Sequence, residues 1–295
     1  MKNKENAIIP YLFETEALQV CPEDKPFWYT SNTIGPFYVN THYLYGNKEK
    51  AVQLLSIIDQ ALENKDTCSQ LVFEQVQQNY QEDATYRFVI DEMCSYIQEN
   101  MDIQNIDYIS GGERRDWFFS LMLAELLDKK HITLFKDQSA HLFYKGQTSN
   151  MQHLESVRSE KQCPEVLHIA DLITQASSYG TAWIPAIKVL GGTLKESLVV
   201  IDRVQGGKAF LESQSVKSHA MVFIDSTLFD DAKRRGLISP SQHNMILEYQ
   251  KDPFQAMRQF LLAHPDFIQK CIAVGGKDAV RAQKCLDVDI YQLNK

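Results

Sequence analysis

The sequence lacks three features that would place it in a large class of proteins. Its six cysteines include no CxxC pair and no regular spacing, which argues against a zinc ribbon or a disulfide framework. No stretch approaches ~18 consecutive apolar residues, so we expect a cytoplasmic protein without a membrane partner. Basic residues are also scarce: 30 lysines and arginines stand against 38 aspartates and glutamates, and a net charge of −8 disfavours a nucleic-acid partner.

Several catalytic signatures are missing as well. The eight histidines form no HExxH pattern, so no zinc enzyme is expected, and we interpret His168 as a core residue. No Gly-x-Ser-x-Gly occurs, and nothing marks a cysteine nucleophile. The Gly207-Lys208 pair is not a Walker loop, because Asp202 stands at its first glycine position and Ala209 replaces the magnesium-binding hydroxyl.

The sequence does contain the elements of an α/β protein. With 44% hydrophobic residues, its 295 residues can fill a substantial core. Short β-prone runs occur at 106–109, 131–135, 198–201 and 221–224. Helical stretches lie between them, one after Gly111-Gly112 and one over about 170–190 that ends at Gly191-Gly192. This alternation predicts a parallel sheet covered on both faces, with ligands at the carboxyl ends of its strands.

Two flanking segments differ from this core. Residues 1–104 begin as a loop-rich stretch with many aromatic residues and continue with two amphipathic helices across about 49–100. Residues 227–295 are predicted to be helical, because Ser239 and Asp252 are each followed by Pro and then by Gln at the third position. We therefore divide the chain into 1–104, 105–226 and 227–295.

One candidate phosphate loop follows the strand at 198–201. There Asp202 ends an apolar run, and Gly206-Gly207 precede a predicted helix. Glycines permit a tight turn, and a helix N-terminus presents N–H groups to a phosphate. An ordinary βα turn that needs glycine for its geometry explains the same residues.

A second candidate loop covers residues 110–116, where Arg114 and Arg115 follow two glycines. Guanidinium groups match the oxygens of a pyrophosphate. The alternative is a solvated, charged first helical turn with internal ion pairs. Because both loops follow strands of one parallel sheet, we expect them at the same carboxyl edge, and two such loops together favour function.

Three stretches of the sequence resemble the type I phosphoribosyltransferases, in particular orotate phosphoribosyltransferase. Residues 31–40 are similar to the family's N-terminal Ser-Pro-Tyr-Phe-Phe-Asn segment, 110–115 fall at its pyrophosphate loop, and 199–209 fall at its diphosphoribose loop. The resemblance covers roughly 27–225. It implies a homodimer with a parallel-sheet phosphoribosyltransferase type I fold, an N-terminal hood-like, helical segment and a helical C-terminal extension.

The resemblance also implies a reaction: transfer of ribose 5-phosphate from phosphoribosyl pyrophosphate (PRPP) to a nitrogenous base, with Mg²⁺ bound through PRPP. Catalysis would come from positioning and charge stabilisation. The implied catalytic residues are Asp202 for the ribose and Arg114, Arg115 and Lys136 for the departing pyrophosphate. The implied PRPP-binding residues are Gly111, Gly112, Glu113, Arg203, Val204, Gln205, Gly206, Gly207, Lys208 and Ala209. The implied base pocket includes Tyr38 and Ser226.

Two departures from the family pattern bear on this reaction. The family carries two adjacent acids where this sequence has Asp202 and Arg203, and the guanidinium is expected to pair with Asp202 and to weaken the role of Mg²⁺. The family's Asp-Arg-Gln follows the next strand, and its arginine holds the carboxylate of orotate. It falls here at residues 225–227, with Ser226 in place of the arginine, so orotate is expected to bind poorly.

Three hypotheses follow for the function. The leading one is a phosphoribosyltransferase of the orotate type that transfers ribose 5-phosphate to a nitrogenous base, with orotate itself a doubtful substrate. The second, which Arg203 favours, is a regulatory protein of the same fold that binds a nucleotide or PRPP without turnover. The third is a structural subunit whose loops bind nothing.

Overall fold

The computed structural model describes residues 6–155 and 163–293 and divides the chain into two units. The first unit contains residues 1–16 and 41–224, and the second contains 17–40 and 225–295. This division differs from the three expected ranges, because residues 17–40 join the helical tail rather than the helices that follow them. No helix in the described part of the chain is long and apolar enough to cross a membrane.

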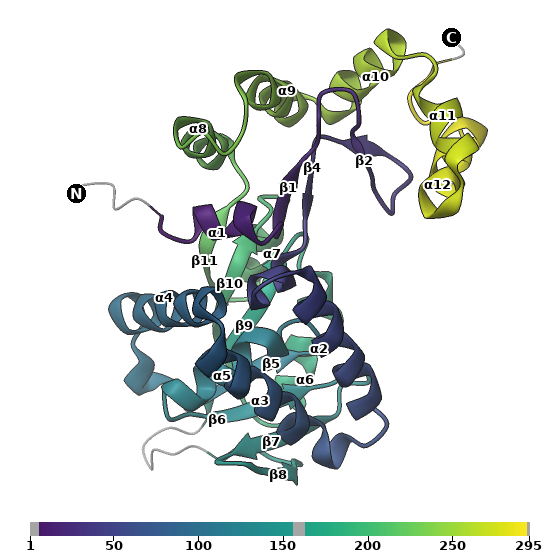
Figure 1. The fold of residues 1–295 in the computed structure, drawn as a ribbon. Coiled ribbons are helices and arrows are strands. Elements are labelled where there is room, and N and C mark those ends of the chain that lie inside the picture. Colours follow the sequence, from purple (N-terminus) through teal and green to yellow (C-terminus); the bar gives the residue numbers. More distant parts are fainter. Residues whose placement is uncertain (1–5, 156–162, 294–295) are drawn as a thin grey trace. The chain divides into compact units, whose positions relative to one another are not determined.

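A seven-stranded sheet forms the centre of the first unit (Figure 1). Its strands, in spatial order, are β11 (Lys217–Phe223), β10 (Thr193–Asp202), β9 (Glu165–Ile173), β5 (Tyr108–Gly112), β6 (Lys130–Leu134), β7 (Ala140–Tyr144) and β8 (Gln147–Asn150). The first five of these are parallel to one another. Strand β7 runs antiparallel to both of its neighbours, β6 and β8. The predicted parallel sheet is therefore confirmed, with an antiparallel hairpin at one edge.

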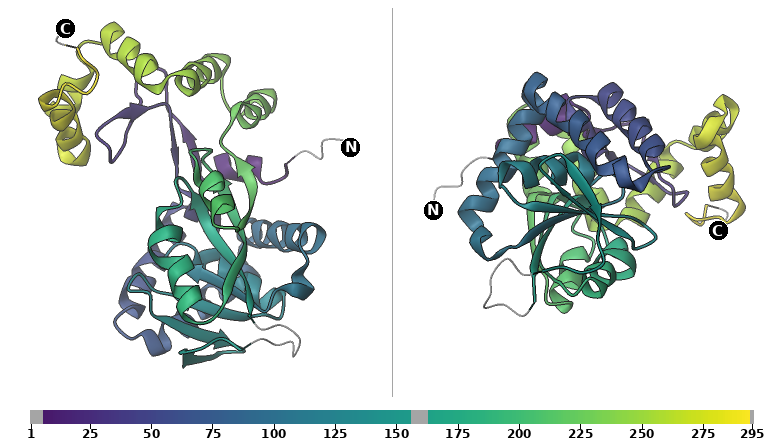
Figure 2. Two further views of the ribbon diagram at one scale, coloured as in Figure 1. Left: turned by 180° about the vertical axis from the view of Figure 1, so that it is seen from behind. Right: turned by 90° about the horizontal axis from the view of Figure 1, so that it is seen from below.

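Helices cover both faces of this sheet (Figure 2). On one face lie α2 (Lys48–Ala61), α3 (Lys65–Glu82), α4 (Ala84–Asn100) and α5 (Trp117–Leu126), and on the other α6 (Ile184–Val189) and α7 (Gly207–Ser213). The prediction of two helices across 49–100 is wrong, since there are three. Asn64 and Asp83 accept hydrogen bonds from the first turns of α3 and α4, and such N-caps start new helices.

The prediction of one helix over about 170–190 is also wrong in its first part. Residues 165–173 form β9, which is central in the sheet and mostly buried. A strand buried on both faces has no apolar–polar alternation, so its pattern resembles a buried helix. Helical structure begins only at Ser177, passes through a π-helical turn at Tyr179–Trp183 and continues as α6. Gly191 ends it with φ +82°, as predicted.

The remaining elements are short. In the first unit they are α1 (Ile9–Glu14) and the 3₁₀ turns Thr41–Tyr45 and Ile103–Asn105. The second unit contains the strands β1 (Leu18–Val20), β2 (Phe27–Trp28), β3 (Ile34–Gly35) and β4 (Phe37–Val39) and the helices α8 (Ser226–Arg234), α9 (Pro240–Lys251), α10 (Pro253–Ala263), α11 (Phe267–Val274) and α12 (Gly276–Asp287). Ser239 and Asp252 cap α9 and α10 as predicted, and Trp28 packs in a core with residues of the tail such as Met257 and Phe267.

Candidate functional site

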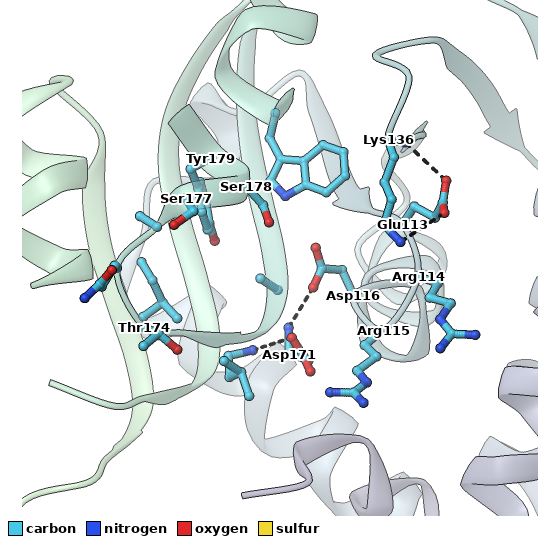
Figure 3. Close-up of a pocket in the computed structure, with 16 residues that line it drawn as sticks. Glu113, Arg114, Arg115, Asp116, Lys136, Asp171, Thr174, Ser177, Ser178 and Tyr179 are labelled. Carbon is cyan, nitrogen blue, oxygen red and sulfur yellow. Dashed lines mark hydrogen bonds and ion pairs between the residues drawn. The ribbon is translucent and has the colours of Figure 1, made fainter. Parts of the chain in front are cut away.

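The order of the parallel strands identifies where a ligand would bind. Numbered along the chain, the five parallel strands have the spatial order 5-4-3-1-2, so the connections diverge between β5 and β9. Loops that leave in opposite directions open a crevice at the carboxyl ends of these two strands. A cavity of about 480 Å³ lies there (Figure 3). It is lined by Glu113, Arg114, Arg115, Asp116 and Lys136 and by Ala170–Tyr179 together with Trp183.

Close packing brings the end of β5 to this cavity. A Cβ on Gly111 would lie 2.1 Å from Ser120 Oγ on α5, and one on Gly112 would lie 2.3 Å from the indole of Trp183. Only glycine permits both approaches. The peptide bond between Glu113 and Arg114, in the turn that follows, is cis.

Three cations line the cavity, but two of them are paired within the protein. Arg114 forms an ion pair with Asp59, and Lys136 Nζ lies 3.4 Å from Glu113 Oε1. The N–H of Lys136 also donates to Glu113 Oε2 at 3.1 Å. Within residues 6–155 and 163–293, the guanidinium of Arg115 has no hydrogen-bond or ion-pair partner. Its guanidinium is therefore the cation most available to an anionic ligand.

A buried histidine lies close enough to the two arginines for their charges to affect its pKa. His42, in the 3₁₀ turn Thr41–Tyr45, is buried, and its Nδ1 has no hydrogen-bond partner in the described part of the protein. Burial, followed by the charges of Arg115 and Arg114, lowers the pKa of His42 to about 3. His42 is thus neutral at physiological pH and does not add a charge beside the arginines.

Two buried carboxyl groups face each other at the wall of the cavity (Figure 3). Asp116 Oδ1 accepts a hydrogen bond from the N–H of Asp171 at 3.0 Å, and Asp116 Oδ2 accepts one from the N–H of Gly112 at 3.0 Å. Asp116 thereby connects the end of β5 to the end of β9. Burial first, and then the charge of Asp116, raise the pKa of Asp171 to about 7, while Arg115 acts in the opposite direction.

His168 lies beneath this pair in the sheet and is fully buried. Its Nδ1 lies 2.9 Å from Ser110 Oγ, and its Nε2 lies 3.4 Å from Asp116 Oδ2. Its ring also stacks on Trp183, with centroids 6.2 Å apart. The interpretation of His168 as a core residue agrees with this burial, and its polar neighbours connect it to the site.

The loop after β9 supplies free N–H groups. None of the backbone N–H groups of residues 174–178 has a hydrogen-bond acceptor within 6–155 and 163–293. Ala176 has φ +57°, and helical structure starts at Ser177, so the N–H groups of this turn are unpaired as at any helix start. Such groups bind phosphate oxygens. This loop lies opposite Arg115 across the cavity (Figure 3).

The predicted site residues divide into two sets. Glu113, Arg114, Arg115 and Lys136 line the cavity, and Gly111 and Gly112 lead into it. Residues 202–209 do not line it, although they lie at the same edge of the sheet as 110–115, as predicted: β5, β9 and β10 are parallel neighbours. Tyr38 and Ser226 belong to the second unit, so their assignment to a base pocket stays a prediction.

Two details of the loop after β10 correct the sequence analysis. Gly207 packs against the β9 loop: its N–H donates to the carbonyl of Thr174 at 2.9 Å, and a Cβ would lie 2.5 Å from Ile173. Arg203 does not pair with Asp202, whose Oδ1 accepts the N–H of Val204 at 2.7 Å, and Arg203 Nε is buried without a partner in the described part of the chain. The glycine is thus explained by packing between two neighbouring loops.

Sequence reasoning missed the residues that β9 contributes to the cavity, chiefly Asp171, Thr174, Ser177 and Ser178. It included Asp116 in the second candidate loop but gave it no role. A signal was present, because an acid near the end of an apolar run is followed by Thr, Ser and Ser before a helical stretch. The expectation of a helix over 170–190 concealed it.

Comparison with known proteins bears on the fold. No protein-family model matches the chain, and neither does any curated protein. Among solved structures, orotate phosphoribosyltransferase from Francisella tularensis aligns with 83% of this chain and 97% of its own, at 13% identity and a TM-score of 0.51. UMP synthase from Leishmania donovani aligns with 83% of this chain, at 13% identity and a TM-score of 0.51, and the match spans 41% of that longer chain. The chain therefore has the type I phosphoribosyltransferase fold, as the sequence predicts.

Proposed function

We propose that this protein binds a phosphoribosyl ligand in the cavity between β5 and β9 and transfers its ribose 5-phosphate to a nitrogenous base. The observation that supports this best is the pairing, across one cavity, of the unpaired N–H groups of 174–178 with the free guanidinium of Arg115. Amides at a helix start suit a phosphate monoester, and a guanidinium suits a second phosphate group. A sugar with a phosphate group at each end would therefore meet the N–H groups of 174–178 at one end and Arg115 at the other.

In this proposal each side of the cavity has one role. Residues 174–178 hold the 5′-phosphate, and Arg115, with Arg114 and Lys136, stabilises charge on the departing pyrophosphate. Asp171 lies between them, where the ribose would sit. Catalysis comes from positioning and charge stabilisation, as the sequence analysis expects. This proposal assigns the phosphate loop to the residues after β9, whereas the sequence analysis assigns it to the residues after β10.

This shift also changes the expectation for the base. In the family pattern, the strand after the phosphate loop is followed by an arginine that holds the carboxylate of orotate. With the phosphate loop after β9, that next strand is β10, which is followed by Arg203 rather than Ser226. The buried, unpaired Nε of Arg203 is consistent with an arginine that lacks its anionic partner. We therefore propose a base that carries a carboxylate, and orotate becomes the first base to test.

A divalent metal fits this site poorly as a protein-bound ion. The described residues contain no group of three or more metal-ligating side chains. Ala170 supplies no carboxylate beside Asp171, and both oxygens of Asp116 accept N–H groups. We propose that Mg²⁺ enters only with the phosphates of PRPP, since Mg²⁺ commonly binds through substrate phosphates.

The test is a titration of ribose 5-phosphate and PRPP by calorimetry, followed by measurement of pyrophosphate release with a panel of bases. Arg115→Gln should weaken PRPP binding about tenfold or more, because a charge-assisted contact is lost. Lys208→Gln is the matched control, since Lys208 belongs to the loop after β10 and its side chain forms an ion pair with Glu212. A larger loss with Lys208→Gln than with Arg115→Gln would return the phosphate loop to β10 and refute the proposal.

A second candidate function is ligand binding without turnover. It is supported by the internal pairing of Arg114 and Lys136, which leaves less charge for a departing pyrophosphate. This function predicts measurable binding of PRPP or a nucleotide, but no pyrophosphate release with any base. Release above the rate of spontaneous hydrolysis would exclude it.

A further inference from the structure

The two carboxyl groups at the cavity wall have unequal surroundings. Asp116 accepts two backbone hydrogen bonds, from Gly112 and Asp171, and His168 Nε2 lies 3.4 Å from its Oδ2. Hydrogen bonds donated to a carboxylate favour its ionised form. Asp171 accepts one hydrogen bond, from the N–H of Leu172 to Oδ1 at 2.7 Å. Its Oδ2 is buried and has no partner among the described residues.

This asymmetry decides which group ionises first. Two carboxylates in contact inside a protein repel each other, so one of them holds its proton to higher pH. The two N–H donors of Asp116 compensate a negative charge there. The group with an unpartnered, buried oxygen holds the proton, which is Asp171, because burial of an unpaired charge costs more than burial of a neutral carboxyl.

We propose that Asp116 and Asp171 act as one proton-sharing carboxyl pair, in which Asp116 fixes the ends of β5 and β9 and Asp171 holds the proton that keeps the negative charge of the cavity wall low. This inference rests on the proposed function, because it concerns the same cavity. It makes Asp116 a positioning residue and Asp171 a residue whose protonation sets the charge that the ligand meets. The raised pKa of Asp171, about 7, agrees with this assignment.

The other charged and titratable groups around the pair come from three elements. Arg115, on the turn after β5, favours the ionised form of Asp171 and opposes the effect of Asp116. His168 lies on β9 itself. Tyr179, from the π-helical turn, is buried near both carboxyl groups and near Asp202 at the end of β10, and its pKa is raised, so it stays neutral. The balance among these groups leaves Asp171 protonated below about pH 7.

The consequence for binding has a definite sign. Below the pKa of Asp171 the cavity wall carries one negative charge from the pair, and above it the wall carries two. A sugar phosphate is a dianion above its second pKa of about 6, so it is repelled more strongly as Asp171 ionises. Affinity should therefore fall as the pH rises through 7.

The experiment is a calorimetric titration of ribose 5-phosphate, without metal, at several values between pH 7 and 8.5, where the ligand charge is constant. The parent protein should lose about tenfold in affinity over this range if only the protonated form binds. Asp171→Asn keeps the shape and the neutrality of the protonated group. It should bind independently of pH in this range, and at pH 8.5 it should bind more tightly than the parent. Asp128→Asn should behave like the parent, because Asp128 precedes the amino end of β6 and does not line the cavity.

The outcomes separate this inference from the proposed function. If Asp171→Asn is folded and binds more weakly than the parent at every pH, Asp171 acts as an anion and the proton-sharing pair is refuted. If the parent binds with no change between pH 7 and 8.5, the pair is refuted without any variant. If the parent does not bind ribose 5-phosphate at any pH, the proposed function fails as well. Asp116→Asn removes the charge that raises the pKa of Asp171, so the fall in affinity should occur at lower pH in this variant.

Discussion

The contact between Gly112 and Trp183 gives the most direct test of how the cavity is built. In Gly112→Ala the new Cβ would lie 2.3 Å from the indole, whereas ordinary contacts begin near 3.4 Å. The indole cannot move away freely, because Trp183 is buried and stacks on His168. Forcing a methyl group into a filled core costs about 1–3 kcal/mol. We expect about 2–3 kcal/mol here, because ring and backbone both resist.

A double-mutant cycle separates this clash from a general effect of alanine. Trp183→Phe removes the part of the ring system that the methyl group would meet, and the smaller residue alone should cost about 2 kcal/mol through the space it leaves. In urea denaturation, the double variant Gly112→Ala/Trp183→Phe should be more stable, by at least ~1 kcal/mol, than the sum of the two single effects predicts. Gly146→Ala is the control, since no atom lies within 4 Å of its Cβ and it should be additive with Trp183→Phe. Additivity of Gly112→Ala with Trp183→Phe would refute the reasoning.

Three further predictions concern the elements around the site. Gly207→Val should destabilise the first unit by about 2 kcal/mol or more in urea denaturation, because its side chain would meet Ile173 and the carbonyl of Thr174; an unchanged midpoint would contradict this. Thr133→Val should cost about 1–3 kcal/mol, because Thr133 Oγ1 joins Ser69 to His131 Nδ1 in the buried core, and a neutral effect on thermal unfolding would contradict it. Because the pKa of Asp171 is higher in the folded protein than in the unfolded chain, its stabilising contribution is complete below about pH 4 and is lost as the pH rises through 7. The free energy of unfolding of Asp171→Asn should therefore increase relative to that of the parent as the pH rises from 5 to 8. A difference that does not change with pH would contradict this.

The sequence predicted the type of fold because local signals and topology agreed. The apolar runs that became β5, β6, β10 and β11 are short and bounded by turns, which is the pattern of buried parallel strands. The caps at Ser239 and Asp252 were predicted from side-chain chemistry alone, because the N-cap hydrogen bond is local in sequence. The order of the strands was beyond this reasoning, since it depends on contacts between distant segments.

The candidate site was predicted on one side only. The turn after β5 carries arginines on a glycine pair, and these residues do line the cavity. On the other side, the acid and glycines after β10 resembled a phosphate loop, while β9 was hidden in a predicted helix. Gly207 shows why the pattern misled: a glycine required for contact with a neighbouring loop cannot be distinguished, in one sequence, from a glycine required for contact with a ligand.

The two carboxyl groups of the site, those of Asp116 and Asp171, come from segments that are distant in the sequence. Along β9, Ala170 precedes Asp171, so this strand offers a single acid where adjacent acids are expected for the family. Asp116 precedes α5, in the turn after β5, and brings its carboxylate to the N–H of Asp171. A second acid is thus present in space although it is absent from the local sequence. Asp116 accepts hydrogen bonds from backbone N–H groups at the ends of both β5 and β9, so its displacement would loosen both strand ends. The same side chain therefore sets the charge of the site and the positions of these two strand ends.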